Sequence, residues 1–251
     1  RALGDRDAAR LDALAARYDQ MVPDPLAPER LRTLASLEGP LFGYLGKLIP
    51  QKGVQRVIEA TALLPNARAA IVGFGTHREW LHALVAAIDR GDAGAIAWLA
   101  GRMELETPVD ATGIASRVTF TGFLDHRYAP GVVAALDVLV VPSIGPEAFG
   151  MVAAEGAAGG ALPLVARHSG LAEVAAALEG AAGRPGLFSF EPGSGGGRRL
   201  AGGIRSILAL SEADRAGLRE AVAGFVRSEW TWERTAERLL DAALAVRGSK
   251  P

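Results

Sequence analysis

Between Leu41 and Phe190 the chain alternates short apolar runs with longer helical patterns, and this alternation limits the possible folds more than any other feature. Strands that alternate with helices form a parallel sheet with helices on both faces. The sequence therefore predicts an α/β fold with a doubly wound parallel sheet. The expected strands are Leu41–Leu45, Ala69–Val72, Val118–Thr121, Val138–Val141, Leu162–Ala166 and, least clearly, Leu187–Phe190. Helical patterns occupy Val54–Leu64, Thr76–Arg90, Gly150–Ala158 and Leu171–Leu178.

Composition excludes several classes of protein. The 251 residues are 49% hydrophobic, which suffices for a large core, and the net charge of −1 offers no basic excess for nucleic acid. The absence of cysteine excludes thiol catalysis, iron–sulfur clusters and disulfide scaffolds. No uncharged apolar run reaches about 18 residues, so we expect no transmembrane segment. The four histidines lack metal-binding spacing, and we expect no metal and no cofactor.

The chain divides into a short lead-in and one domain. Residues 1–37 are expected to form a lead-in helix and linker, since Pro23, Pro25 and Pro28 interrupt the helical pattern. Residues 38–251 are expected to form the domain, with an inserted helix and loop at Gly91–Ser116. Because the chain begins at Arg1 and not at methionine, we expect a fragment or a processed product.

Two local patterns give finer expectations. Thr76 and Glu79 have the spacing of a capping box, which predicts that a helix begins directly after Gly75. The glycine-rich stretch Glu191–Gly197 is typical of a flexible surface loop.

Ligands of doubly wound sheets bind beyond the carboxyl ends of the strands, so the residues that follow each strand are the candidates for a site. The first strand is followed by Gly46-Lys47-Leu-Ile-Pro-Gln-Lys52-Gly53. Two lysines on such a turn can bind a diphosphate, although the motif taken alone is better explained as a solvated turn with two surface lysines. The segment is not a Walker A loop, because Leu48 stands where a magnesium-binding Ser or Thr is required.

The second strand is followed by Gly73-Phe74-Gly75, which resembles the start of a dinucleotide fingerprint. Arg78 occupies the place of the third glycine, so an NAD-dependent oxidoreductase is the less favoured interpretation. A tight turn that brings the backbone of Gly73 and Gly75 near a ligand fits better.

After the fourth strand, Glu147 and Glu155 are separated by seven residues. If a helix begins near Gly150, the N–H groups of Gly150, Met151 and Val152 point toward an anion between the two carboxylates. Carboxylates accept hydrogen bonds from vicinal hydroxyls, so sugar and ribose rings are natural ligands. A helix cap and a solvated face are the alternative, but the alanines and glycine around Glu155 form an apolar setting in which a charge requires a reason.

The segment after the fifth strand, Arg167–Glu173, offers two interpretations. It can close the pocket, or it can serve as the loop and cap of the next helix. The structural interpretation is favoured.

Taken together and in this order, these segments resemble the donor-binding domain of glycosyltransferase family 4, the group 1 retaining enzymes of GT-B fold. The resemblance runs from about Leu41 to Val246. Besides the two lysines and the paired glutamates, it rests on Val72-Gly73-Phe74-Gly75, Val118-Thr-Phe-Thr-Gly122-Phe123, Asp137-Val-Leu-Val-Val-Pro142-Ser143 and Trp232-Glu-Arg-Thr-Ala236.

The resemblance implies a fold and a set of roles. The domain would be Rossmann-like, the C-terminal half of a GT-B fold. Lys47 and Lys52 would bind the diphosphate of a nucleotide sugar, Glu147 the transferred sugar and Glu155 the ribose. Phe149, Gly150, Met151 and Val152 would offer backbone donors, and Phe123 and Leu124 would border the base. Lys52 and Glu147 would be the catalytic residues.

The implied function is transfer of a hexose from a UDP-, GDP- or ADP-sugar to a hydroxyl acceptor. The N-terminal acceptor domain of the family has no counterpart in residues 1–37, so the chain alone is expected to be inactive. Lys47 departs from the family's usual arginine and would bind phosphate as a point charge. A non-catalytic module that binds nucleotide sugars is the alternative. We expect a cytoplasmic location, with peripheral contact to a membrane face left open.

Overall fold

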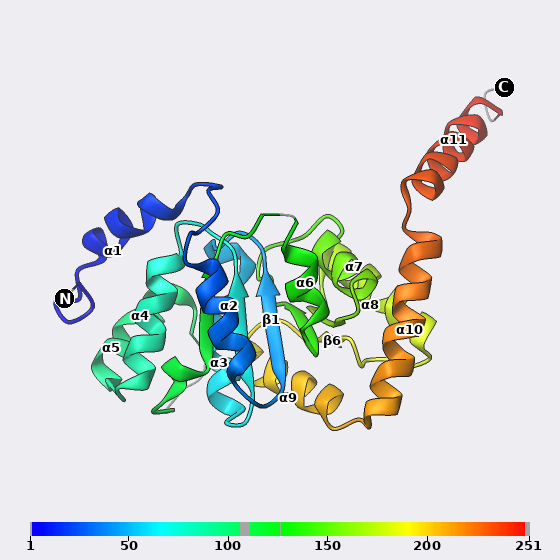
Figure 1. Cartoon of the computed structure of the whole chain (residues 1–251). Helices are drawn as coiled ribbons and strands as arrows, with labels where there is room; N and C mark the ends of the chain where they lie inside the picture. Colours follow the sequence, from blue (N-terminus) through cyan, green and yellow to red (C-terminus); the bar gives the residue numbers. More distant parts are fainter. Residues whose placement is uncertain (1, 106–110, 126, 249–251) are drawn as a thin grey trace.

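A computed structural model describes residues 2–105, 111–125 and 127–248. The centre of the protein is a six-stranded, fully parallel sheet with strand order β3-β2-β1-β4-β5-β6 (Figure 1). The strands are β1 Leu41–Leu45, β2 Arg68–Val72, β3 Val118–Gly122, β4 Val138–Val141, β5 Leu162–Ala166 and β6 Ser189–Phe190. This order is that of a Rossmann-like doubly wound sheet, which confirms the predicted fold class.

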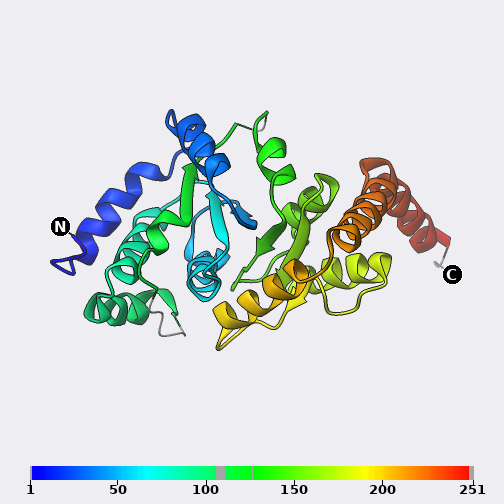
Figure 2. The ribbon, with the colours of Figure 1, turned by 60° about the horizontal axis from the view of Figure 1, so that its bottom comes forward.

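Helices cover both faces of the sheet. Figure 2 shows α2 and α6 on one side of it and α3 and α9 on the other. The helices are α1 Ala8–Ala15, α2 Ala27–Ser36, α3 Gln55–Leu63, α4 Arg78–Asp89, α5 Ala93–Met103, α6 Ala129–Ala134, α7 Met151–Ala158, α8 Ser169–Ala182, α9 Gly196–Leu208, α10 Glu212–Glu229 and α11 Trp232–Gly248. Among them α5 lies in the predicted insertion, part of which (106–110) falls outside the described residues.

Alternate side chains of β1 enter different parts of the core. Phe42 and Tyr44 of β1 join the main cluster with α3, whereas Leu41 packs with Leu34 of α2 on the opposite face. This period-two alternation explains how an almost continuously apolar strand is buried on both faces. The strand segments were therefore predictable to within a few residues.

The lead-in packs against the sheet domain. Leu11 of α1 is buried in the main core, and Trp80 of α4 donates an indole hydrogen bond of 2.8 Å to Asp12. The proline-rich stretch is also less irregular than expected, because α2 begins at Ala27 with Pro28 in its first turn. Proline is tolerated there, since the first-turn N–H groups have no helical acceptor.

The predicted capping box is wrong. Helix α4 begins at Arg78, its N-cap is His77, and no side chain caps it. The Glu79 carboxylate instead pairs with Arg78 at 2.5 Å, so it does not reach back to the backbone of Thr76. The ion pair between Arg78 and Glu79 is therefore present in place of the predicted cap.

The glycine-rich stretch is also only partly a loop. Gly196 and Gly197 are the first residues of α9 and are buried. A Cβ atom on Gly196 would lie 1.2 Å from the Arg56 guanidinium, and one on Gly197 would lie 2.6 Å from the Glu59 carboxylate. These glycines therefore allow the close approach of α9 to the buried charges of α3.

Within the described ranges, no helix is long and apolar enough to cross a membrane.

The buried His77 and the half-buried His82 make the fold sensitive to acid. Burial lowers the pKa of His77 and of His82 to about 4; nearby Asp12 opposes the shift at His77, and the charges of Arg78 and Arg30 reinforce it at His82. The unfolded chain takes up these protons near pH 6.5. The free energy of unfolding should therefore fall as the pH drops from about 6.5 to about 4.

The variant His82→Phe should show a shallower decline over this window, because it removes one of the two groups and can keep the ring stack on Phe120. Denaturant unfolding of both proteins over a pH series measures the difference. Identical pH dependence in wild type and variant would contradict the assignment.

Candidate functional site

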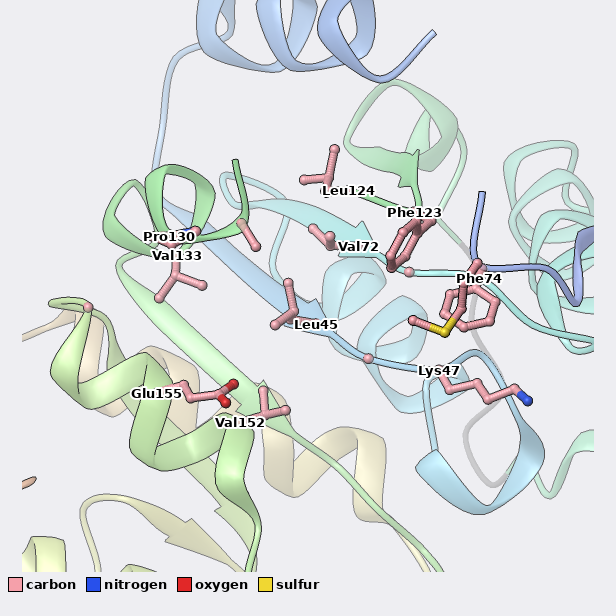
Figure 3. A pocket seen from close by; sticks show the side chains of 15 residues that line it. Leu45, Lys47, Val72, Phe74, Phe123, Leu124, Pro130, Val133, Val152 and Glu155 are labelled. Carbon is pink, nitrogen blue, oxygen red and sulfur yellow. The ribbon is translucent and has the colours of Figure 1, made fainter. Parts of the chain in front are cut away.

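The sheet reverses its winding direction between β1 and β4, which are hydrogen-bonded neighbours. On one side of this pair the chain continues from β1 to β2 and β3, and on the other side it continues from β4 to β5 and β6. The loops after β1 and β4 therefore lead away from each other and leave a crevice at the carboxyl edge of the sheet. A cavity of about 470 Å³ opens there. Its lining comes from the ends of β1, β2 and β3, from α6 and α7, and from Met21 of the lead-in (Figure 3).

Glu155 and Lys47 both line this cavity and lie on different sides of it (Figure 3). Glu155 extends from the second turn of α7, and its side chain is exposed. The expected apolar setting of Glu155 is therefore wrong. The neighbouring Gly156 faces the sheet, where a Cβ atom on it would lie 2.2 Å from Leu139, whereas Glu155 lines the cavity. This glycine lets α7 approach the sheet closely.

Lys47 lies at the end of β1 and already has a counter-ion. Its ammonium is 3.1 Å from a carboxylate oxygen of Asp19 and 5.8 Å from the centre of the Phe74 ring. The Lys47 carbonyl accepts a hydrogen bond of 2.9 Å from the Tyr44 hydroxyl. Burial, together with the negative charge of Glu147, raises the pKa of Tyr44, so the phenol remains protonated and keeps donating. The cation is thus held at the rim of the cavity.

The glycines after β1 and β2 are required by the contact between their loops. A Cβ atom on Gly73 would lie 1.8 Å from the carbonyl oxygen of Gly46, and one on Gly75 would lie 2.3 Å from that of Leu48. Gly73 lines the cavity. Gly75 is not among the lining residues and packs against the Lys47–Leu48 turn instead.

Lys52 and Glu147 form a second ion pair beside the crevice. Lys52 ends the 3₁₀ turn Pro50–Lys52, and its ammonium is 2.5 Å from Oε1 of Glu147. The same oxygen accepts a hydrogen bond of 2.6 Å from the Ser143 hydroxyl. Burial acts to raise the pKa of Glu147. The hydrogen bonds from Lys52 and Ser143, with the positive charges of Lys52 and His168, outweigh burial and hold that pKa below its ordinary value.

The loop after β4 leads into the N-terminus of α7. Gly150 is the N-cap with φ of +94°, and a Cβ atom on it would lie 2.4 Å from Leu171. The N–H groups of Met151 and Val152 precede the first intrahelical bond, so they have no acceptor within the helix. Phe149 packs edge-on against Trp230 at 5.0 Å.

The structure brings only part of the predicted set together. Lys47, Gly73, Phe123, Leu124, Val152 and Glu155 line the 470 Å³ cavity. Lys52 and Glu147 lie outside that lining, joined to each other. Phe149 and Met151 line a separate cavity of about 690 Å³ between α7 and the start of α11, which Glu155 also borders.

Several residues at the site had no sequence signal of their own. Asp19 and Met21 belong to the lead-in, which was expected to be separate from the domain. His168 and Ser169 belong to the Arg167–Glu173 segment, for which the structural interpretation was favoured. Ser169 Oγ accepts the Glu147 N–H at 2.9 Å, so this loop supports the Glu147 loop directly.

Across the described part of the chain, no three His, Asp or Glu side chains gather closely enough to hold a metal ion.

Removal of the Lys52 ammonium should raise the pKa of Glu147. In Lys52→Met the effect of burial persists, while the strongest hydrogen bond and the nearest positive charge are lost. A carboxyl ¹³C NMR titration of Glu147 measures the change. Lys47→Met is the matched control, because its ammonium pairs with Asp19 and should leave the Glu147 titration unaltered. Equal titration curves for wild type and Lys52→Met would disprove the coupling.

Comparison with known proteins agrees with this geometry. Residues 28–216 match the family model described as glycosyl transferases group 1. The chain is 31% identical over 153 residues to 2-deoxystreptamine N-acetyl-D-glucosaminyltransferase of Streptomyces fradiae, covering 57% of this chain and 31% of that protein. It is 28% identical over 236 residues to D-inositol 3-phosphate glycosyltransferase of Mycobacterium marinum, covering 93% of this chain and 45% of that protein.

A crystal structure of Anabaena HepE in complex with UDP has the same fold, with a TM-score of 0.62 and 21% identity over 88% of this chain and 53% of that one. The chain spans less than half the length of the two curated relatives. The family match covers most of the described sheet domain and α2. The chain therefore belongs to the group 1 family of glycosyltransferases.

Proposed function

We propose that the chain is the donor-binding part of a retaining glycosyltransferase that moves a hexose from a nucleotide sugar to a hydroxyl acceptor. The observation that carries this proposal is the cavity at the switch point, bordered by Lys47 on one side and Glu155 on the other. A cation suits a diphosphate, and a carboxylate suits the two hydroxyls of a ribose. A nucleoside diphosphate contains both groups.

The relatives support a nucleotide sugar as the ligand. HepE was crystallised with UDP, and the two curated relatives are named as glycosyltransferases. We propose a UDP-, GDP- or ADP-sugar as the donor. The base would lie against Phe123 and Leu124, where Phe123 packs edge-on against Phe74 with ring centres 5.2 Å apart.

In this proposal donor binding exchanges the partners of both lysines. The diphosphate replaces Asp19 at Lys47 and Glu147 at Lys52, and the N–H groups at the start of α7 face the same anion. Glu147, released from Lys52, accepts hydrogen bonds from the sugar hydroxyls. As the sugar–phosphate bond breaks, negative charge grows on the leaving diphosphate, and the lysines and helix N–H groups stabilise it.

The acceptor site is proposed to lie in sequence beyond this chain, because the chain spans less than half of its curated relatives. The chain alone would then bind the donor without transferring its sugar, since no second wall excludes water or positions the acceptor. We propose that neither a metal nor a cofactor takes part and that the protein is cytoplasmic.

The ribose role of Glu155 gives the direct test of the proposed function. Among UDP, GDP and ADP, the tightest ligand should bind Glu155→Gln more weakly by about 1.5 kcal/mol, because two hydroxyls lose a charged acceptor. The 2′,3′-dideoxy form of the same nucleotide should bind both proteins alike. Isothermal titration calorimetry measures all four affinities.

Glu173→Gln is the matched control, because it removes the same charge from the exposed face of α8 and should change neither affinity. If Glu155→Gln weakens the ribo and dideoxy forms equally, Glu155 does not bind ribose. If none of the three nucleotides binds the wild-type chain, the proposed function is wrong.

Asp19 should act as a competitor of the diphosphate at Lys47. Asp19→Asn should strengthen nucleoside diphosphate binding about two- to threefold, since an exposed ion pair contributes roughly 0.5 kcal/mol. Glu38→Gln, which removes the same charge elsewhere in the segment before β1, should leave the affinity unchanged. Calorimetry of the wild type and both variants at one salt concentration measures the three affinities. If both variants gain the same affinity, the change in net charge explains the gain and Asp19 does not compete with the diphosphate.

A further inference from the structure

A closed ring of hydrogen bonds surrounds the loop that carries Glu147. The Glu147 N–H donates to Ser169 Oγ at 2.9 Å, and Ser169 Oγ lies 3.1 Å from Nδ1 of His168. Nε2 of His168 lies 2.7 Å from the Ser143 carbonyl oxygen. The Ser143 hydroxyl closes the ring by donating to the Glu147 carboxylate at 2.6 Å.

The chemistry of the partners determines the direction of each bond. A carbonyl oxygen can only accept, so Nε2 of His168 carries a proton and donates it to Ser143. Ser169 Oγ already accepts the Glu147 N–H, and its own hydroxyl proton can be donated to Nδ1 of a neutral imidazole. The ring therefore requires a proton on Nε2 of His168 and excludes the neutral Nδ1–H tautomer.

The backbone around Ser169 is strained in a way that these bonds can stabilise. Ser169 has φ of +46°, in the left-handed region that non-glycine residues rarely adopt. Its neighbour Gly170 donates its N–H to the Glu147 carbonyl at 2.9 Å, and a Cβ atom on Gly170 would lie 2.2 Å from the Ala148 carbonyl oxygen. The two loops are thus in backbone contact, and strain of this kind concentrates at functional sites.

We propose that His168 is a positioning residue that, through Ser143 and Ser169, orients the Glu147 carboxylate toward the sugar of the donor. This inference rests on the proposed function. When Lys52 turns to the diphosphate, Glu147 loses its ion-pair partner, and the Ser143 hydroxyl remains as its restraint. His168 holds the carbonyl of that serine and, through Ser169, the N–H of Glu147 itself. Its effect should therefore fall on sugar recognition and not on binding of the diphosphate.

The first test uses the ligand-free chain. Two-bond ¹H–¹⁵N NMR spectra of histidine-labelled protein at about pH 8, above the ordinary histidine pKa, report which ring nitrogen carries the proton. We expect a protonated Nε2 and an unprotonated Nδ1 for His168. An Nδ1–H tautomer would overturn the inference, because Nε2 could not then donate to Ser143.

The second test measures sugar recognition as the ratio of two affinities. UDP with UDP-glucose, GDP with GDP-mannose and ADP with ADP-glucose serve as probe pairs, and the pair that binds the wild type is used. His168→Phe keeps a flat ring and loses both hydrogen bonds, whereas His168→Gln loses the ring and keeps an amide N–H that can reach the Ser143 carbonyl. If His168 only fills space, His168→Phe should keep the sugar preference and His168→Gln should lose it. If His168 is a positioning residue, the opposite result is expected.

We expect His168→Phe to reduce the preference for the nucleotide sugar over the free diphosphate by about three- to tenfold, the loss expected for one or two hydrogen bonds. His168→Gln should recover most of it. Arg167→Gln is the matched control, because Arg167 is the neighbour of His168 in the same loop and its guanidinium donates to Glu179 and Ser189. Thermal melting of each ligand-free variant accompanies the titrations.

The outcomes separate the two proposals. If no probe pair binds the wild type, the proposed function fails and this inference loses its premise. If the wild type binds a nucleotide sugar and His168→Phe retains the full sugar preference, only the role of His168 is wrong. A loss of the same size in Arg167→Gln would show a general loop effect and would also overturn the role.

Discussion

The site depends on the contact between the loop after β1 and the loop after β4. The N–H groups of Ile144 and Gly145 both donate to the Gln51 carbonyl, at 2.8 and 2.9 Å. A Cβ atom on Gly53 would lie 2.1 Å from the Pro142 carbonyl oxygen, so the two backbones touch. These loops leave adjacent parallel strands in opposite directions, and the contact joins them again above the crevice. Lys52 and Glu147 meet because of it.

Each of the two lysines at the crevice is paired with a carboxylate of the chain. Lys52 is paired with Glu147, and Lys47 is paired with Asp19. The pairs differ in burial: both side chains of the Lys47 pair are about two-fifths exposed or more, whereas Glu147 is 17% exposed. An exposed pair contributes little and can be exchanged for a phosphate at low cost. In the proposed donor complex, the less exposed Glu147 would lose Lys52 to the diphosphate and would accept hydrogen bonds from the sugar hydroxyls instead.

The sequence predicted those features that depend on local periodicity. The strands, the main helices and the turns after β1, β2 and β4 follow from hydrophobic spacing and glycine placement, and the position of Glu155 at the cavity follows from its place on α7. The ion pairs Lys47–Asp19 and Lys52–Glu147 join residues 28 and 95 positions apart, so no local pattern reveals them. The Thr76–Glu79 spacing misled because the Glu79 carboxylate pairs with the neighbouring Arg78 instead of capping the helix. The proposed role of His168 could not be inferred from the sequence, because it depends on how the loops after β4 and β5 lie against each other.

The lead-in completes the cavity that the sheet begins. Asp24 donates its N–H to the Phe123 carbonyl at 3.1 Å, and Arg30 bridges Asp24 and the Thr121 carbonyl. A Cβ atom on Gly122 would lie 2.5 Å from the Asp24 side chain, so only glycine permits this approach at the end of β3. The segment that precedes β1 therefore holds the residues proposed to border the base, and it supplies Met21 to the wall and Asp19 to Lys47.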